Sequence, residues 1–150
     1  MHKQISRKIY FAILILCIIS LIFSIVVELQ KKNNETIGNI CKVIDGGNSC
    51  QTVQQSKYSQ TFGIDNPYFG MVGFSILIII CSIQLIKSNH RASKHFDYIL
   101  LIGPIISGLV ALYFIYLQIF VIRAFCVYCL VVDACSIALF IMLLSLIIKK

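Results

Sequence analysis

The sequence predicts an all-α integral membrane protein: a four-transmembrane-helix bundle with an extracytoplasmic loop that carries a short capping helix. Hydrophobic residues make up 59% of its 150 residues, whereas charged residues make up only 13%. The mean hydropathy is +0.90, and a soluble domain of this length does not have enough charge to cover so much apolar surface. The composition excludes a water-soluble enzyme, a disordered tail and a collagen-like fibre, and it indicates one membrane domain over residues 1–150.

Four long apolar segments account for this composition. A helix needs about 20 mostly apolar residues to cross a hydrocarbon core of about 30 Å, and each segment is close to that length or longer. The predicted spans are residues 9–27, 68–86, 98–122 and 125–148, and the extracytoplasmic loop covers residues 28–67. The apolar runs are continuous, whereas the strands of a membrane β-barrel alternate between apolar and polar residues. The segments are therefore expected to be helices.

The charged residues that flank these segments predict the orientation. The side that holds both termini carries eight basic residues against one acid, Asp97, whereas the other side carries five basic residues against four acids. The net charges are thus +7 and +1, and the positive-inside rule assigns the more basic side to the cytoplasm. Both termini are expected there, and the basic surplus is a topology signal and not a sign of nucleic-acid binding.

The cysteines divide into two groups by this topology. Three lie inside the spans, where a free cysteine usually behaves as a small apolar residue: Cys17, Cys81 and Cys135. Four lie on the extracytoplasmic side, where disulfides form and persist. These are Cys41 and Cys50 in the loop, and Cys126 and Cys129 in a CxxC motif at the start of the fourth span.

The position of the CxxC motif favours redox chemistry. A helix N-terminus has free backbone N–H groups and about half a positive elementary charge, and both favour the thiolate, which is the form that exchanges disulfides. Two intervening residues let Cys126 and Cys129 meet across one turn, so the pair can cycle between dithiol and disulfide. The turn-rich residues 45–49 separate Cys41 from Cys50, and their flexibility suits a disulfide that moves between partners.

Other roles for the four extracytoplasmic cysteines stay open. The loop pair lacks the short spacing of a zinc site, and His2, His90 and His95 all map to the other side, so no metal site is expected. A structural disulfide in the loop is compatible with a small four-span scaffold or assembly protein. The thiolates are also compatible with a soft-metal binder.

The order of these motifs resembles the vitamin K epoxide reductase family, whose members place two loop cysteines before a CxxC motif on the last of four spans. Ser56 follows the second loop cysteine by six residues, as a serine or threonine does in that family. Phe62-Gly63 and then Asn66 precede the second span, and Ala-Phe-Cys-Val-Tyr-Cys at residues 124–129 resembles the bacterial form of the active motif. The resemblance covers essentially the whole chain, and it is to a bacterial-type homologue without a fused thioredoxin-like domain.

The resemblance implies a quinone-dependent disulfide oxidoreductase that supports disulfide bond formation in a bacterial or archaeal inner or cell membrane. Its expected partners are a separate thioredoxin-like, DsbA-like protein, membrane lipid and a membrane quinone of the ubiquinone, menaquinone or vitamin K type. The chain is expected to be a monomer. Cys41 and Cys50 would take electrons from the protein partner; Cys50 would then attack Cys126 through a mixed disulfide and free Cys129 to face the quinone.

Four further residues are candidates for the quinone site. The resemblance places Ser56 and Asn66 near the quinone head group, with Asn66 as a hydrogen-bond donor to a carbonyl oxygen; a capping or turn role is the alternative. Tyr113 and Tyr116 lie toward the extracytoplasmic end of the third span and are candidates for a pocket wall, although interfacial tyrosines commonly anchor a helix. Vertebrate members have a tyrosine four residues after the second CxxC cysteine, where this chain has Asp133.

Asp133 is also a candidate because of its own chemistry. At about 100° per residue it lies about 20° from Cys126 and about 40° from Cys129 around the helix, one to two turns deeper. A carboxylate in a span is costly and usually faces a bundle interior or a cavity. Because quinone reduction consumes two protons, Asp133 is predicted to relay or donate them. A carboxyl that only hydrogen-bonds across helices is the alternative.

Small residues and the loop predict how the bundle closes. Gly103, Ser107 and Ala111 recur at four-residue spacing, which gives a small-xxx-small face for close helix approach in lipid. The loop residues 52–62 are expected to form the capping helix, with Val53 and Phe62 pointing toward the bundle.

Overall fold

Four long helices dominate the computed structural model, which describes residues 7–32, 49–86 and 94–148. They are α1 (Arg7–Lys32), α4 (Asn66–Ile86), α5 (Lys94–Tyr116) and α6 (Val127–Ile148), and α5 continues into a π-helical segment, η1 (Leu117–Ile122). Each of the four is long and apolar enough to cross a membrane. The predicted four-transmembrane-helix bundle is therefore confirmed.

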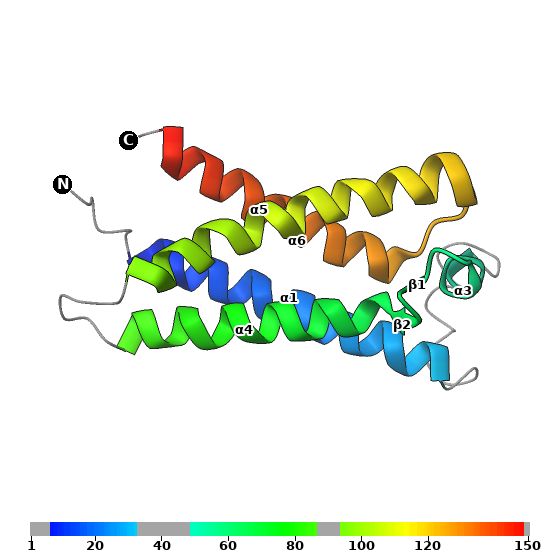
Figure 1. Cartoon of the computed structure of the whole chain (residues 1–150), viewed down its shortest axis with the longest axis horizontal. Coiled ribbons are helices and arrows are strands. Elements are labelled where there is room, and N and C mark those ends of the chain that lie inside the picture. The colour runs from blue at the N-terminus through cyan, green and yellow to red at the C-terminus, as the bar shows by residue number, and fades with distance from the viewer. Residues whose placement is uncertain (1–6, 33–48, 87–93, 149–150) are drawn as a thin grey trace.

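The helices pack in the order α4, α1, α6, α5 (Figure 1). The start of α1 and the end of α6 lie at one end of the bundle, whereas the short elements between residues 49 and 65 lie at the other end. α1 runs to Lys32, beyond the predicted end of the span at residue 27. An ion pair between Lys32 and Glu28, 3.4 Å apart at adjacent turns, stabilises this extension.

The segment that covers one end of the bundle is partly helical. The predicted capping helix exists, but it is shorter and begins earlier, as α3 (Ser49–Gln55). A two-stranded antiparallel hairpin follows, β1 (Gln60–Thr61) and β2 (Ile64–Asp65). Its two loop residues, Phe62 and Gly63, have φ of 55° and 78°, as a two-residue hairpin turn of type I′ requires. This turn leaves the Phe62 side chain 97% exposed, so the prediction that Phe62 points toward the bundle is wrong, whereas Val53 does pack inward.

Two clusters of buried side chains hold the bundle together. The first draws on all four helices and consists of Ile13, Cys17, Phe74, Leu77, Ile80, Cys81, Leu100 and Leu139. Cys17 and Cys81 are fully buried free thiols within it, and Cys135 is a partly buried free cysteine. The second, which we call the cysteine cluster, consists of Val27, Cys50, Cys126 and Tyr128. It lies where α3 and α1 meet the start of α6.

Two glycines on α5 let neighbouring helices approach closely. A Cβ at Gly103 would lie 2.9 Å from Cδ2 of Leu77 on α4, and one at Gly108 would lie 2.7 Å from Cβ of Phe140 on α6. The small-residue face predicted from the sequence thus includes one of these contacts, at Gly103. All three residues of that face, Gly103, Ser107 and Ala111, also line a cavity.

Gly108→Ala is expected to destabilise the bundle by about 1–3 kcal/mol, because the added methyl group overpacks the contact with the Phe140 Cβ. The matched control is Gly73→Ala on α4, where an added Cβ has nothing within 4 Å. This control is expected to gain up to about 1 kcal/mol of helix propensity. Thermal unfolding of both purified variants in detergent measures the two effects, and equal melting temperatures would contradict the close approach of α5 to α6.

Candidate functional site

The CxxC motif caps the N-terminus of α6. The backbone N–H of Leu130 donates to the Cys126 carbonyl at 2.9 Å, and the Cys129 N–H donates to the Cys126 sulfur at 3.4 Å. Cys126 therefore occupies the N-cap position, where a side-chain acceptor satisfies one free N–H group of the first turn. Because α6 begins at Val127, two residues after the predicted start of the span, the first cysteine stands at the helix terminus itself.

The two thiols of the motif lie against each other. Cys126 and Cys129 are both free, and the Cys129 sulfur donates to the Cys126 sulfur at 2.7 Å. This hydrogen bond lowers the pKa of the Cys126 thiol below its ordinary value of 9.0 against the opposing effect of burial, and backbone N–H groups at the helix start act in the same direction. Cys126 is thus the cysteine suited to be a thiolate and to exchange disulfides.

Helix α3 brings the second loop cysteine to the same place. Cys50 is buried and disulfide-bonded, and it belongs to the cysteine cluster together with Cys126. Gln54, one turn further along α3, donates to Oε1 of Gln30 on α1 at 3.2 Å and also hydrogen-bonds the Cys126 thiol. These contacts hold the loop over the CxxC motif. Cys41, the other predicted loop cysteine, lies outside the described residues.

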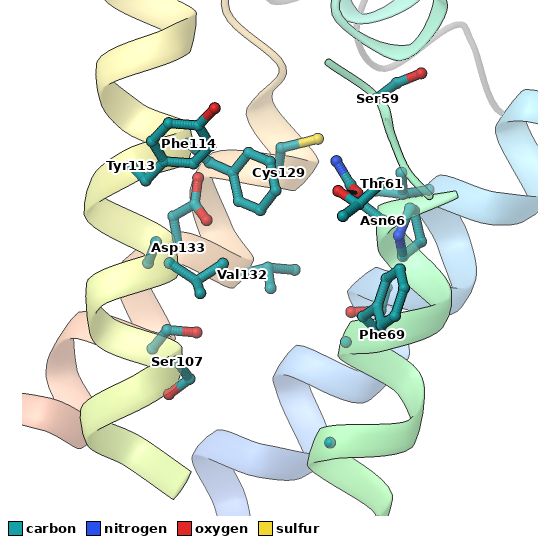
Figure 2. Close-up of a pocket in the computed structure, with 18 of the residues that line it drawn as sticks. Ser59, Thr61, Asn66, Phe69, Ser107, Tyr113, Phe114, Cys129, Val132 and Asp133 are labelled. Atoms are coloured by element: carbon teal, nitrogen blue, oxygen red, sulfur yellow. Dashed lines mark hydrogen bonds between the residues drawn. The ribbon is translucent and has the colours of Figure 1, made fainter. Parts of the chain in front are cut away.

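A cavity of about 700 Å³ lies beside Cys129 (Figure 2). α4 and α5 face each other across it, α6 and α1 contribute further side chains, and the segment between α3 and α4 covers one end. Figure 2 shows Cys129 and Asp133 on one side of this space and Asn66 and Phe69 on the other. Five residues predicted for the redox centre or the quinone site line the cavity: Ser56, Asn66, Tyr113, Cys129 and Asp133.

Ser56 and Asn66 line the cavity and also stabilise the segment that covers it. The Ser56 hydroxyl donates to the Val53 carbonyl at 2.8 Å, at the end of α3. The Asn66 amide donates to the Tyr58 carbonyl at 2.7 Å and accepts from the Thr61 hydroxyl at 2.7 Å. The capping and turn roles are therefore present. The second N–H of the Asn66 amide and the lone pairs of the Ser56 hydroxyl keep capacity for a ligand.

The hairpin is tied to the bundle by a charged contact. The Lys31 ammonium on α1 forms an ion pair with Asp65 on β2. The hydrogen bond from Lys31, with a second from the Gln60 amide at 2.8 Å, holds the pKa of the Asp65 carboxyl below its usual range. These contacts fix the position of the hairpin over the cavity.

The Asp133 carboxyl has a hydrogen-bond partner, Gln118, that was not among the residues predicted for the site. Asp133 is 6% exposed and Gln118, on η1, is 2% exposed. The Gln118 side-chain nitrogen donates to Oδ2 of Asp133 at 3.3 Å, and its side-chain oxygen accepts from the backbone N–H of Cys126 at 3.0 Å. Both residues line the cavity. A strongly polar side chain inside the third predicted span is the signal that could have identified Gln118, since such residues in membranes are usually functional.

The two predicted tyrosines have different environments. Tyr113 lines the cavity and lies beside Phe114, with ring centroids 5.7 Å apart. Tyr116 packs on Phe120, with ring centroids 5.2 Å apart, and is 53% exposed. The structure does not bring Tyr116 to the cavity, and exposure does not distinguish the two tyrosines, because Tyr113 is 54% exposed.

The sequence matches a known protein family over nearly its whole length. The matching family model is described as "Vitamin K epoxide reductase family", and it covers residues 11–144. This range contains all seven cysteines. The chain belongs to this family. The resemblance drawn from the motifs is thereby confirmed, and membership of the vitamin K epoxide reductase family makes the protein a membrane oxidoreductase. No curated protein matches the sequence.

Proposed function

We propose that this member of the vitamin K epoxide reductase family is a thiol:quinone oxidoreductase that oxidises a separate thioredoxin-like, DsbA-like protein and delivers the electrons to a membrane quinone. One observation carries the proposal: the CxxC motif adjoins the loop cysteine on one side and the cavity on the other. Cys126 shares the cysteine cluster with Cys50, whereas Cys129 lines the cavity. Electrons can therefore enter at Cys126 and leave at Cys129.

Disulfide exchange would carry the electrons inward. The partner's dithiol reduces the Cys41–Cys50 disulfide and becomes a disulfide itself. The Cys50 thiolate then attacks Cys126 in the oxidised CxxC motif, which forms a Cys50–Cys126 mixed disulfide and releases Cys129 as a thiolate. Cys41 attacks Cys50, re-forms the loop disulfide and releases Cys126. After this step the CxxC motif is a dithiol and Cys50 is again disulfide-bonded to Cys41.

The residues around the cavity fit a quinone. Apolar side chains such as Phe69 and Val132 suit a flat apolar ring, and the amide of Asn66 and the carboxyl of Asp133 are convergent polar groups for its carbonyl oxygens. When bound, a quinone accepts two electrons and two protons as the CxxC dithiol returns to a disulfide. In this proposal Asp133 holds a proton at its carboxyl and passes it into the cavity.

The proposed orientation places α3 and the hairpin on the extracytoplasmic side and both termini in the cytoplasm. It rests on the surplus of basic residues that flank the spans on the side of the termini. Disulfides form and persist outside the cytoplasm, so this side suits both the loop pair and its protein partner. The proposed membrane is a bacterial or archaeal inner or cell membrane, in which the chain acts as a monomer.

The test uses the purified protein in lipid nanodiscs, a reduced DsbA-like protein and a quinone, either a ubiquinone or a menaquinone analogue. Quinone absorbance and the thiol content of the partner are followed together. We expect quinone reduction that requires both proteins, with one partner disulfide formed for each quinone consumed. If neither quinone class is reduced above the rate without the membrane protein, the proposed function is wrong.

A further inference from the structure

We propose that Gln118 is a positioning residue that fixes the Asp133 carboxyl relative to the CxxC motif at the wall of the cavity. The inference rests on the proposed function, because it names the residue that orients the acid of the same site. The buried side chain of Gln118 hydrogen-bonds both Asp133, fifteen residues away along the chain, and the backbone of Cys126, eight residues away.

The hydrogen-bond directions follow from the chemistry of the three groups. A backbone N–H can only donate, so the Cys126 N–H fixes the side-chain oxygen of Gln118 toward itself. The nitrogen of the same amide must then point the other way, and it reaches Oδ2 of Asp133. Because an amide nitrogen only donates, Oδ2 is held as an acceptor. The other carboxyl oxygen is left to exchange a proton with the cavity.

The backbone around Gln118 is unusual in a way that serves this arrangement. Gln118 lies in the π-helical segment η1, which ends at Arg123 in the left-handed conformation, with φ 55° and ψ 35°. A non-glycine residue in that region is strained and persists only where the surrounding structure holds it, often at functional sites. π-helical turns are frequent at such sites too. Here the π-helical segment and the left-handed residue Arg123 let the chain turn from α5 to α6 within residues 123–126. This turn places Gln118 beside Cys126.

Gln118→Glu tests the positioning role because it separates the two hydrogen bonds. The new carboxyl group keeps an oxygen for the Cys126 N–H, but it replaces the N–H donor to Asp133 with a second acid, which competes with Asp133 for the proton. We expect quinone reduction to fall by about 10-fold or more, up to the roughly 10²–10⁴-fold that a positioned general acid contributes. Reduction of the protein by its partner, measured without quinone by alkylation of the freed thiols, is expected to stay unchanged. Gln55→Glu, at an exposed position on α3, is the matched control and should alter neither half-reaction.

A double variant that exchanges the amide and the acid between positions 118 and 133 provides a second test. In Gln118→Glu combined with Asp133→Asn, the new amide at position 133 can donate to the new carboxylate at position 118, which still accepts from the Cys126 N–H. The melting temperature is expected to match that of the wild type, while quinone reduction stays low because the acid has moved. Recovery of both properties would show that the location of the acid is unimportant, and it would overturn the proposal.

A spectroscopic measurement separates this inference from the proposed function. The infrared band of the Asp133 carboxyl is assigned by difference against Asp133→Asn, and its frequency is compared between wild type and Gln118→Met. We expect the band to shift, because the carboxyl loses its donor, and this result does not depend on quinone turnover. An unchanged band, or equal losses in both half-reactions of Gln118→Glu together with a lowered melting temperature, would overturn the positioning role. If the band differs between wild type and Gln118→Met but the wild-type protein reduces no quinone, the positioning role stands and the proposed function alone is refuted.

Discussion

Cys129→Ser is expected to reduce quinone turnover to the level measured without the protein. A serine at this position cannot form a disulfide with Cys126, so the CxxC motif can no longer give up two electrons as a dithiol. The matched control is Cys135→Ser, which removes another free, partly buried cysteine of α6 that lies outside the proposed electron path. This control is expected to keep wild-type turnover. Quinone absorbance measures both variants, and undiminished reduction by Cys129→Ser would exclude Cys129 as the electron exit.

A trapping experiment on the same background locates the electron entry. The double variant Cys41→Ser/Cys129→Ser leaves Cys50 and Cys126 without their usual partners, and both belong to the cysteine cluster. Treatment with a thiol oxidant such as diamide is therefore expected to join them, as the two thiols lose two electrons and two protons to the reagent. Peptide mapping by mass spectrometry under non-reducing conditions identifies the link. A link from Cys50 to any other cysteine would contradict the proposed order of transfer.

Much of the fold could be predicted from the sequence because the membrane imposes simple rules. Continuous apolar runs of about 20 residues in lipid must satisfy their backbone groups internally, so they become helices. The differences at the ends have local causes, such as the Glu28–Lys32 pair that extends α1. The CxxC motif could also be placed at a helix start, since its apolar run begins there. The structure adds that Cys126 itself is the N-cap residue.

The remaining features depend on contacts and backbone conformations that a linear pattern does not encode. The π-helical segment has the same apolar composition as the α-helix before it, so no periodicity marks the change at Leu117. The pairing of Gln118 with Asp133 spans the turn between two helices. The hairpin places Phe62 in a left-handed conformation, which is uncommon for a bulky residue. A helical interpretation of that segment therefore failed at this residue.

Asp133→Asn is expected to lower the rate of quinone reduction by about 10²–10⁴-fold, the range that a positioned general acid contributes. Asparagine has nearly the same shape, and its side-chain oxygen can still accept from Gln118, so the contact between α6 and η1 survives. The exchangeable carboxyl proton is lost. Reduction of the protein by its partner is expected to be unchanged, because that half-reaction involves Cys50 and Cys126. Stopped-flow measurements of the two half-reactions separate these effects.

The two interpretations of Asp133 predict opposite outcomes for this substitution. A carboxyl that only joins helices can be replaced by an amide that makes the same contact, so full quinone-coupled turnover over a range of pH would show that the relay is wrong. Asp65→Asn is the matched control, because it also removes a carboxyl, whereas its side-chain oxygen can still accept from Lys31 and Gln60 and so keep the hairpin in place. Its turnover is expected to match the wild type. Asp133 and Cys129 line the same cavity. The loss of rate in Asp133→Asn should therefore be confined to quinone reduction, the half-reaction in which Cys129 gives up electrons and the quinone takes up protons.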